Sequence, residues 1–146
     1  MRSIRLSRLR TARHRMILLP LRDAMRALRR GIAQPHHVDV LHQAVRIAAH
    51  MDQGKPLGMS GHFAAAAQAI DEIRARACGM SCDVPDVPHL AELEVLQTAI
   101  DLHAHQLIRI PVHHYALAVD SVSQLTRCST SPTATLRYPV TEGLPL

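Results

Sequence analysis

Histidine is the side chain of this sequence with the widest chemical range, because a neutral imidazole binds transition metals and titrates near neutral pH. The chain holds 11 histidines in 146 residues. Two groups combine histidine with aspartate at short spacing: His36, His37, Asp39 and His42, and then Asp101, His103 and His105, with His113 and His114 following. Neither group shows the HExxH pattern of zinc proteases or the repeated Glu-x-x-His of di-iron bundles. We therefore expect no metal site and no cofactor.

His103 has a structural interpretation. In the segment from 89 to 108, helical spacing places it on the same side as Leu96 and Ile100. A histidine on the core side of a helix is usually a packing residue with a hydrogen-bond partner. We expect that role for His103, and a solvated i,i+4 pair for Asp101 and His105 on the polar stripe of the same segment.

The cysteine and serine patterns indicate no reaction. Cys78 and Cys82 lie four residues apart in CGMSC, but the remaining cysteine, Cys128, cannot form the second pair that a zinc site needs. No GxSxG motif frames a serine nucleophile, and the lysine of GKPLGMSG is misplaced for a phosphate-binding loop. These patterns favour reduced structural thiols and a protein that is not an enzyme.

The distribution of arginine is the strongest functional signal. Residues 1 to 30 hold ten arginines against Asp23 alone, a balance of +9, while residues 31 to 146 hold seven basic and eleven acidic residues, a balance of −4. A basic segment on an acidic body is typical of proteins that bind polyanions. Sixteen arginines stand beside one lysine, Lys55, which is typical of GC-rich coding, so the use of arginine does not itself indicate phosphate recognition.

The elements that position these residues are predicted to be helices. Proline and glycine separate five segments with helical apolar spacing, and none shows the alternation of a strand. The segments are 20–31, 35–54, 60–79, 89–108 and 111–125. We expect an all-α fold, a compact antiparallel bundle of four to five short helices with a basic N-terminal arm and a disordered C-terminal tail. The predicted divisions are the arm at 1–19, the bundle domain at 20–127 and the tail at 128–146.

The arm and the first predicted helix present their arginines differently. On a helical wheel the arginines of residues 2–15 point in every direction, which predicts a flexible arm and not a helix lying on a membrane. In the segment that begins with Pro20 at the first helical position, the arginines fill the face opposite Leu21 and Met25. Two plainer interpretations stay open, a solvated tail and translation that starts at Met16. The candidate nucleic-acid-binding residues are Arg5, Arg8, Arg10, Arg13, Arg15, Arg22, Arg26, Arg29 and Arg30.

A family resemblance adds to this interpretation. The stretch HAHQLIRIPVHHYALAV, residues 103–119, carries His103, Gln106, Ile110 with Pro111, Tyr115 and Ala118. This pattern resembles the C-terminal part of small helical proteins of Burkholderia-type phages and prophages, often labelled "Fis family transcriptional regulator". MILLPLRDAMRAL and MDQGKPLGMSG hold similar places after a similarly basic start, so the resemblance spans about residues 10 to 125. No helix-turn-helix like that of Fis itself is present, and the tail from Cys128 has no counterpart. The resemblance implies a mobile-element setting and an accessory, non-catalytic role.

Together these features predict a function. We expect a small accessory or regulatory protein of a phage or mobile element that binds nucleic acid with low sequence specificity through its Arg-rich N-terminal region. The few aromatic residues argue against a base-stacking platform. The alternative is a protein-binding module or inhibitor that occludes a host defence or transcription complex, or a homodimer. Because the apolar run at 16–21 is too short for a signal peptide or a membrane span, we expect a cytoplasmic protein that does not contact membranes.

Overall fold

Helices form all the regular structure in the described part of the chain. The computed structural model describes the backbone of residues 2–54, 58–79 and 87–129 and, within these, the side chains of 12–53, 58–79 and 87–128. The five helices are α1 (Arg2–Arg29), α2 (Pro35–Gly54), α3 (Ser60–Gly79), α4 (Leu90–Arg109) and α5 (Val112–Ser129). The prediction of an all-α fold is thereby confirmed for the described residues.

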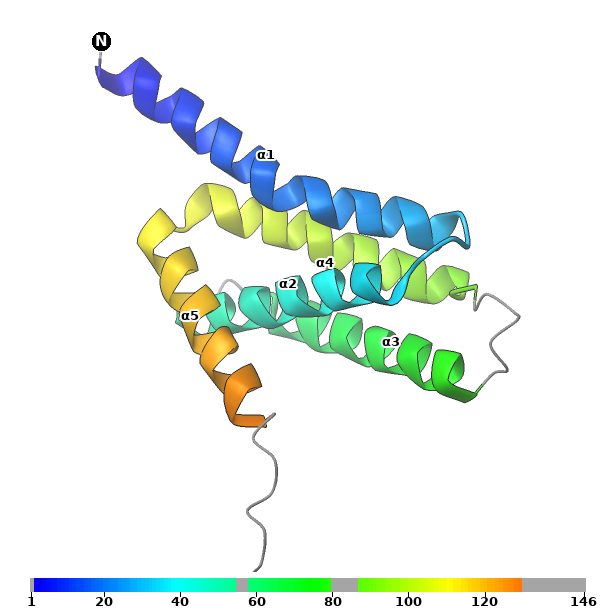
Figure 1. The fold of residues 1–146 in the computed structure, drawn as a ribbon. Coiled ribbons are helices and arrows are strands. Elements are labelled where there is room, and N and C mark those ends of the chain that lie inside the picture. Colours follow the sequence, from blue (N-terminus) through cyan, green and yellow to red (C-terminus); the bar gives the residue numbers. More distant parts are fainter. Residues whose placement is uncertain (1, 55–57, 80–86, 130–146) are drawn as a thin grey trace, which may run out of the picture.

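Four of the helices surround a shared core, and the fifth crosses them. The first four run alternately in opposite directions, and the contacts of α1 with α2, α2 with α3, α3 with α4 and α4 with α1 close a ring (Figure 1). This is the up-down arrangement that short connections favour. Helix α5 packs against α2 and runs across the direction of the other four (Figure 1). Helix α2 therefore contacts every other helix of the described chain.

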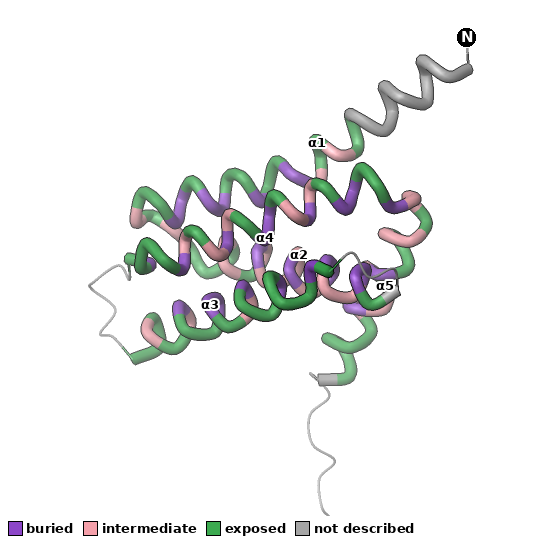
Figure 2. The backbone as a smooth tube through the Cα atoms, turned by 180° about the vertical axis from the view of Figure 1, so that it is seen from behind, coloured by how far each residue is buried: buried purple, intermediate pink, exposed green. Residues whose placement is uncertain are grey.

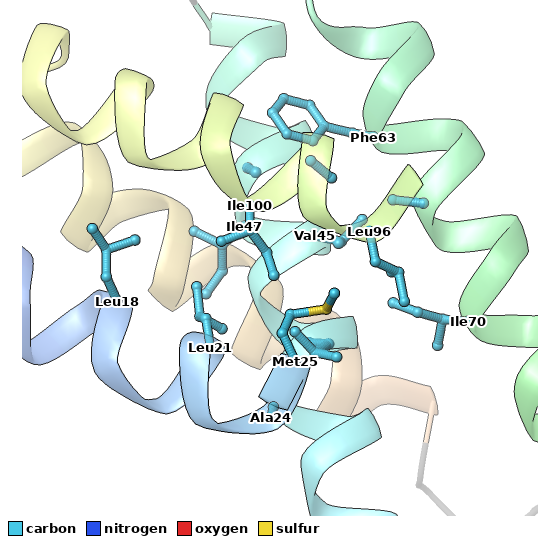
Figure 3. Packing of buried hydrophobic residues seen from close by; sticks show 14 of the residues in the cluster. Leu18, Leu21, Ala24, Met25, Val45, Ile47, Phe63, Ile70, Leu96 and Ile100 are labelled. Atoms are coloured by element: carbon cyan, nitrogen blue, oxygen red, sulfur yellow. The ribbon is translucent and has the colours of Figure 1, made fainter. Parts of the chain in front are cut away.

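The core is built from small and aliphatic side chains. In Figure 2 buried and exposed positions alternate along the helices, as they do when each helix turns one side inward. Figure 3 shows Leu21 and Met25 of α1 pointing toward side chains of the other three bundle helices, among them Ile100 of α4. Ala24, Ala48 and Ala66 are fully buried, and side chains of this size let helix axes approach closely. This packing explains how an alanine-rich sequence with few aromatic residues fills a core.

Helix α1 differs from the helix that the sequence predicts. The predicted start at Pro20 is wrong, because Pro20 lies inside α1, which runs from Arg2 to Arg29. Pro20 is exposed, and Leu18 and Leu21 on either side of it are buried. Packing on both sides therefore holds the helical backbone through a residue that weakens it. At 1.5 Å per residue α1 is roughly 42 Å long against roughly 30 Å for α2, and its N-terminal end extends past the bundle (Figure 1).

The end of α1 follows the sequence prediction. Gly31 has a φ of +69°, a conformation that glycine adopts without strain. Its N–H donates to the carbonyl oxygen of Leu28 at 3.1 Å, and the N–H of Ile32 donates to that of Ala27 at 3.0 Å. These two bonds form a Schellman motif, which satisfies the last carbonyl groups of the helix and fixes the turn into α2.

A charged pair joins the end of α3 to the start of α4. Arg76 donates two hydrogen bonds to the carboxylate of Glu92, each 2.6 Å long, and the N–H of His89 donates to the same carboxylate at 2.8 Å. Glu92 is only 7% exposed. The bonds from Arg76 hold the pKa of Glu92 below its usual range, against the opposing effect of burial. The pair fixes the ends of the connection whose residues 80–86 lie outside the described chain.

The predicted tail is described only at its start. Helix α5 continues through Ser129, and so includes the first two residues that were expected to lie in the tail. The rest of that segment, residues 130–146, lies outside the described residues.

Candidate nucleic-acid interface

Five exposed arginines share the outward side of α1, and we call this set the arginine stripe. At 100° per residue they fall within an arc of about 100°, on the side away from buried Leu21 and Leu28. Three of them repeat every seven residues, a rise of about 10.5 Å along the helix for each step. The members of the stripe are Arg15, Arg22, Arg26, Arg29 and Arg30.

Of the remaining candidate arginines, the structure describes the side chain of Arg13 alone. Arg13 is exposed but lies at a different angle on α1. Burial raises the pKa of the Tyr115 phenol, and the charge of Arg13 nearby opposes that rise. The side chains of Arg5, Arg8 and Arg10 lie outside the described residues.

A groove of about 310 Å³ runs along the stripe between α1 and α4. Arg22, Arg26 and Arg29 line it from α1. From the α4 side, the Gln97 side-chain oxygen accepts a 2.8 Å hydrogen bond from Arg29, and its nitrogen donates to Asp101 at 3.0 Å. The groove thus brings three cations together, with one of them oriented by Gln97.

The arginines of the stripe contribute little to holding the fold together. Arg26 pairs with Asp23 at 3.1 Å, but both side chains are 61% exposed, so solvent screens this attraction strongly. Within the described chain, no ion pair or side-chain hydrogen bond involves Arg15, Arg22 or Arg30. Their guanidinium groups keep a full set of donors for a partner.

Arginines elsewhere are committed to contacts between helices. Arg74 of α3 donates to Asp39 at 2.6 Å and lies 3.0 Å from Nδ1 of His42, both on α2. Arg46 of α2 donates to Thr126 of α5 at 3.0 Å. Within the described chain, Arg29 is the one member of the arginine stripe that makes such a contact, through Gln97 of α4.

The first histidine group of the sequence also serves the fold. Nδ1 of His37 accepts a 2.8 Å hydrogen bond from the N–H of Gln34, the residue before α2. His37 is the third residue of α2, and in a capping box the side chain at that position accepts the same bond. Burial, followed by the charges of Arg74 and Arg46, lowers the pKa of His42. Within the described ranges, no three histidine, cysteine or acidic side chains are arranged to hold a metal ion.

The second histidine group behaves as the sequence predicts at its main position. His103 is 2% exposed and its Nδ1 lies 3.1 Å from the side-chain oxygen of Gln106, which confirms a buried, hydrogen-bonded packing residue. His105 is exposed on the polar stripe of α4. Asp101 has Gln97 as its hydrogen-bond partner.

The sequence gives no sign of the part that Gln97 plays in the groove. Its contact with Arg29 joins residues 68 positions apart, and it depends on how antiparallel α1 and α4 are aligned. The polar position of Gln97 four residues before Asp101 is visible in the sequence, but the alignment of two helices is not.

The two described cysteines do not line this groove. Cys78 and Cys128 are free and exposed, and Cys82 lies outside the described residues. A search of the described helices finds none that combines the length and the apolar character needed to cross a membrane.

Comparison with known proteins gives no relative from which a function could be transferred. No protein-family model, curated protein or solved structure matches the chain.

Proposed function

We propose that this protein binds nucleic acid through the phosphate backbone, with the arginine stripe of α1 as its contact surface. The observation that carries the proposal is that five exposed arginines share one side of one helix, with the exposed Leu19 among them and Asp23 at the edge. The charge of residues 31–146 is −4, so the attraction for a polyanion is concentrated at the N-terminal end.

Binding of this kind needs no particular base sequence. Guanidinium groups donate paired hydrogen bonds to phosphate oxygens, and each contact releases counterions from the nucleic acid. The described side chains of α1 include no phenylalanine, tyrosine or tryptophan that could stack on unpaired bases. This favours a duplex over a single strand as the ligand. We expect weak affinity, with a dissociation constant of about 10⁻⁴ to 10⁻⁶ M at physiological salt.

Binding to the phosphate backbone fits an accessory or regulatory role. A small helical protein that coats or positions nucleic acid would act as an accessory or regulatory factor without catalysing a reaction. The resemblance of residues 103–119 to proteins of Burkholderia-type prophages supports such a role on a mobile element.

The test compares two double variants that lose the same charge. Arg15→Gln/Arg22→Gln removes two guanidinium groups from the stripe, and neither has an ion pair within the described chain. Arg109→Gln/Arg127→Gln removes two exposed arginines from the last turns of α4 and α5. Fluorescence anisotropy with a labelled duplex longer than the roughly 42 Å of α1 measures affinity. We expect the first variant to bind about tenfold more weakly at low salt and the second to bind like the unmodified protein.

The same variants distinguish the alternative of a protein partner. If the arginine stripe meets an acidic protein surface, a pulldown from host lysate recovers that protein after nuclease treatment, and Arg15→Gln/Arg22→Gln loses it. If both double variants bind the duplex with equal affinity, the arginine stripe is not the surface that contacts nucleic acid.

A further inference from the structure

A second, mainly apolar groove lies between α1, α2 and α5. Its volume is about 450 Å³, and its α1 wall includes Ile17 and Leu21, which are not part of the arginine stripe. Val40 and Ile47 of α2 form the facing wall. Small-molecule sites of folded proteins are of this size and combine apolar walls with a few convergent polar groups.

His103 supplies a polar group to this groove. It is the one described residue of α4 that lines it, and the ring of Tyr115 from α5 lies 6.4 Å away between centroids. The end of an imidazole that carries Nε2 extends away from its own helix backbone. His103 lines the groove from α4, and Nε2 is the polar ring atom farthest from that helix.

The hydrogen bonds around His103 fix which ring nitrogen carries the proton. The Gln106 side-chain nitrogen donates to the carbonyl oxygen of Ala48 at 3.1 Å, and a carbonyl oxygen only accepts. The amide oxygen of Gln106 must then face Nδ1 of His103, 3.1 Å away. Because that oxygen also only accepts, Nδ1 must donate. A neutral ring holds one proton, so Nε2 is left as an acceptor.

This acceptor has no partner within the described chain. The bond to Gln106 is the only hydrogen bond of the His103 ring there, and the residue is 2% exposed. Burial lowers the pKa of His103, which keeps the ring neutral at physiological pH. Buried polar atoms in folded proteins are paired as a rule, so an unpaired Nε2 beside a groove indicates a ligand that donates to it.

We propose that this groove binds a small, uncharged, apolar molecule that carries one hydroxyl or N–H group, which donates a hydrogen bond to Nε2 of His103. The walls bury the apolar body of the ligand and the single bond fixes its orientation. Asp39 is the one charged residue that lines the groove within the described chain, which disfavours an anionic ligand. The site is independent of nucleic-acid binding, since it uses no residue of the arginine stripe.

The test uses the 146-residue chain and two probes that differ in one hydrogen-bond donor. 2-Naphthol has an apolar body and one hydroxyl, and 2-methoxynaphthalene has the same rings without the donor. The chain contains no tryptophan, so naphthalene fluorescence is measured against a low background. We expect 2-naphthol to bind about tenfold more tightly than its methyl ether. Nitrogen-15 NMR of the histidine rings should show the Nε2 resonance of His103 shifting only with 2-naphthol.

Three variants locate the site. His103→Phe keeps a ring but removes the acceptor, and should bind both probes equally. Val40→Phe fills the groove while leaving His103 in place, and should bind neither. The matched control, His105→Phe, changes an exposed histidine two residues away and should keep the preference for 2-naphthol. Circular dichroism checks that each variant is folded.

Three results would overturn the proposal. The first is equal binding of the two probes by the unmodified protein. The second is that neither probe binds, in which case a bound water is the only partner of Nε2. The third is a preference for 2-naphthol that survives in folded Val40→Phe.

Discussion

Replacement of Pro20 by alanine should stabilise the protein. Pro20 lies in the interior of α1, where it lacks the N–H that would donate to the carbonyl oxygen of Met16. Proline costs about 3 kcal/mol relative to alanine in a helix interior. Because Pro20 is exposed and water can reach the unpaired carbonyl group, we expect part of that cost, a gain of about 1–3 kcal/mol in the free energy of unfolding.

Urea unfolding followed by circular dichroism measures this gain, and amide hydrogen exchange at residues 13–20 locates it. Leu19→Ala is a useful comparison because it changes an exposed residue next to the proline without adding a backbone donor. If α1 instead began at Pro20, proline would suit the first helical position, and Pro20→Ala would leave the stability unchanged or lower it. That result would refute a helix that continues through residues 12–20 and would detach Arg15 from the arginine stripe.

Two further predictions concern buried polar contacts. Glu92→Gln should lower the free energy of unfolding by about 1–2 kcal/mol at neutral pH, after discounting for the 29% exposure of the Arg76 side chain. Folding lowers the pKa of Glu92, so its negative charge stabilises the folded protein fully above the pKa of the unfolded state. This stabilisation is lost as the pH falls through the pKa of the folded state, and the stabilities of the variant and the unmodified protein should converge in acid. A difference that stays constant with pH would contradict this role. Gln106→Leu should cost about 1–3 kcal/mol, because it leaves Nδ1 of His103 buried without its acceptor and removes the bond between helices that Gln106 donates to the Ala48 carbonyl. Thermal denaturation measures the loss, and a neutral effect would contradict the hydrogen-bond assignment.

Local patterns in the sequence predict much of the helical structure because each depends on neighbouring residues. Apolar spacing places Leu96 and His103 on the buried side of α4, and both are buried. Gly31 ends α1 because it adopts a positive φ without strain, a property of that residue alone. The side chains of the arginine stripe are exposed for a similar local reason, since helical spacing sets them opposite the apolar face.

Features that depend on distant residues could not be predicted in this way. Pro20 has the residue type of a helix start, but burial of Leu18 and Leu21 against other helices outweighs that preference. The contacts of Arg76 with Glu92 and of Arg29 with Gln97 require the alignment of neighbouring helices. The unpaired Nε2 of His103 emerges only once the orientation of the Gln106 amide is known.

The salt dependence of duplex binding tests the role of the arginine stripe most directly. For duplex DNA, the logarithm of the binding constant falls with the logarithm of salt concentration by about 0.9 for each phosphate contact. Arg15→Gln/Arg22→Gln should therefore reduce the steepness of this slope by about 1.8. Arg109→Gln/Arg127→Gln should leave the slope unchanged. A slope that is the same for both variants and the unmodified protein would contradict phosphate binding by the stripe.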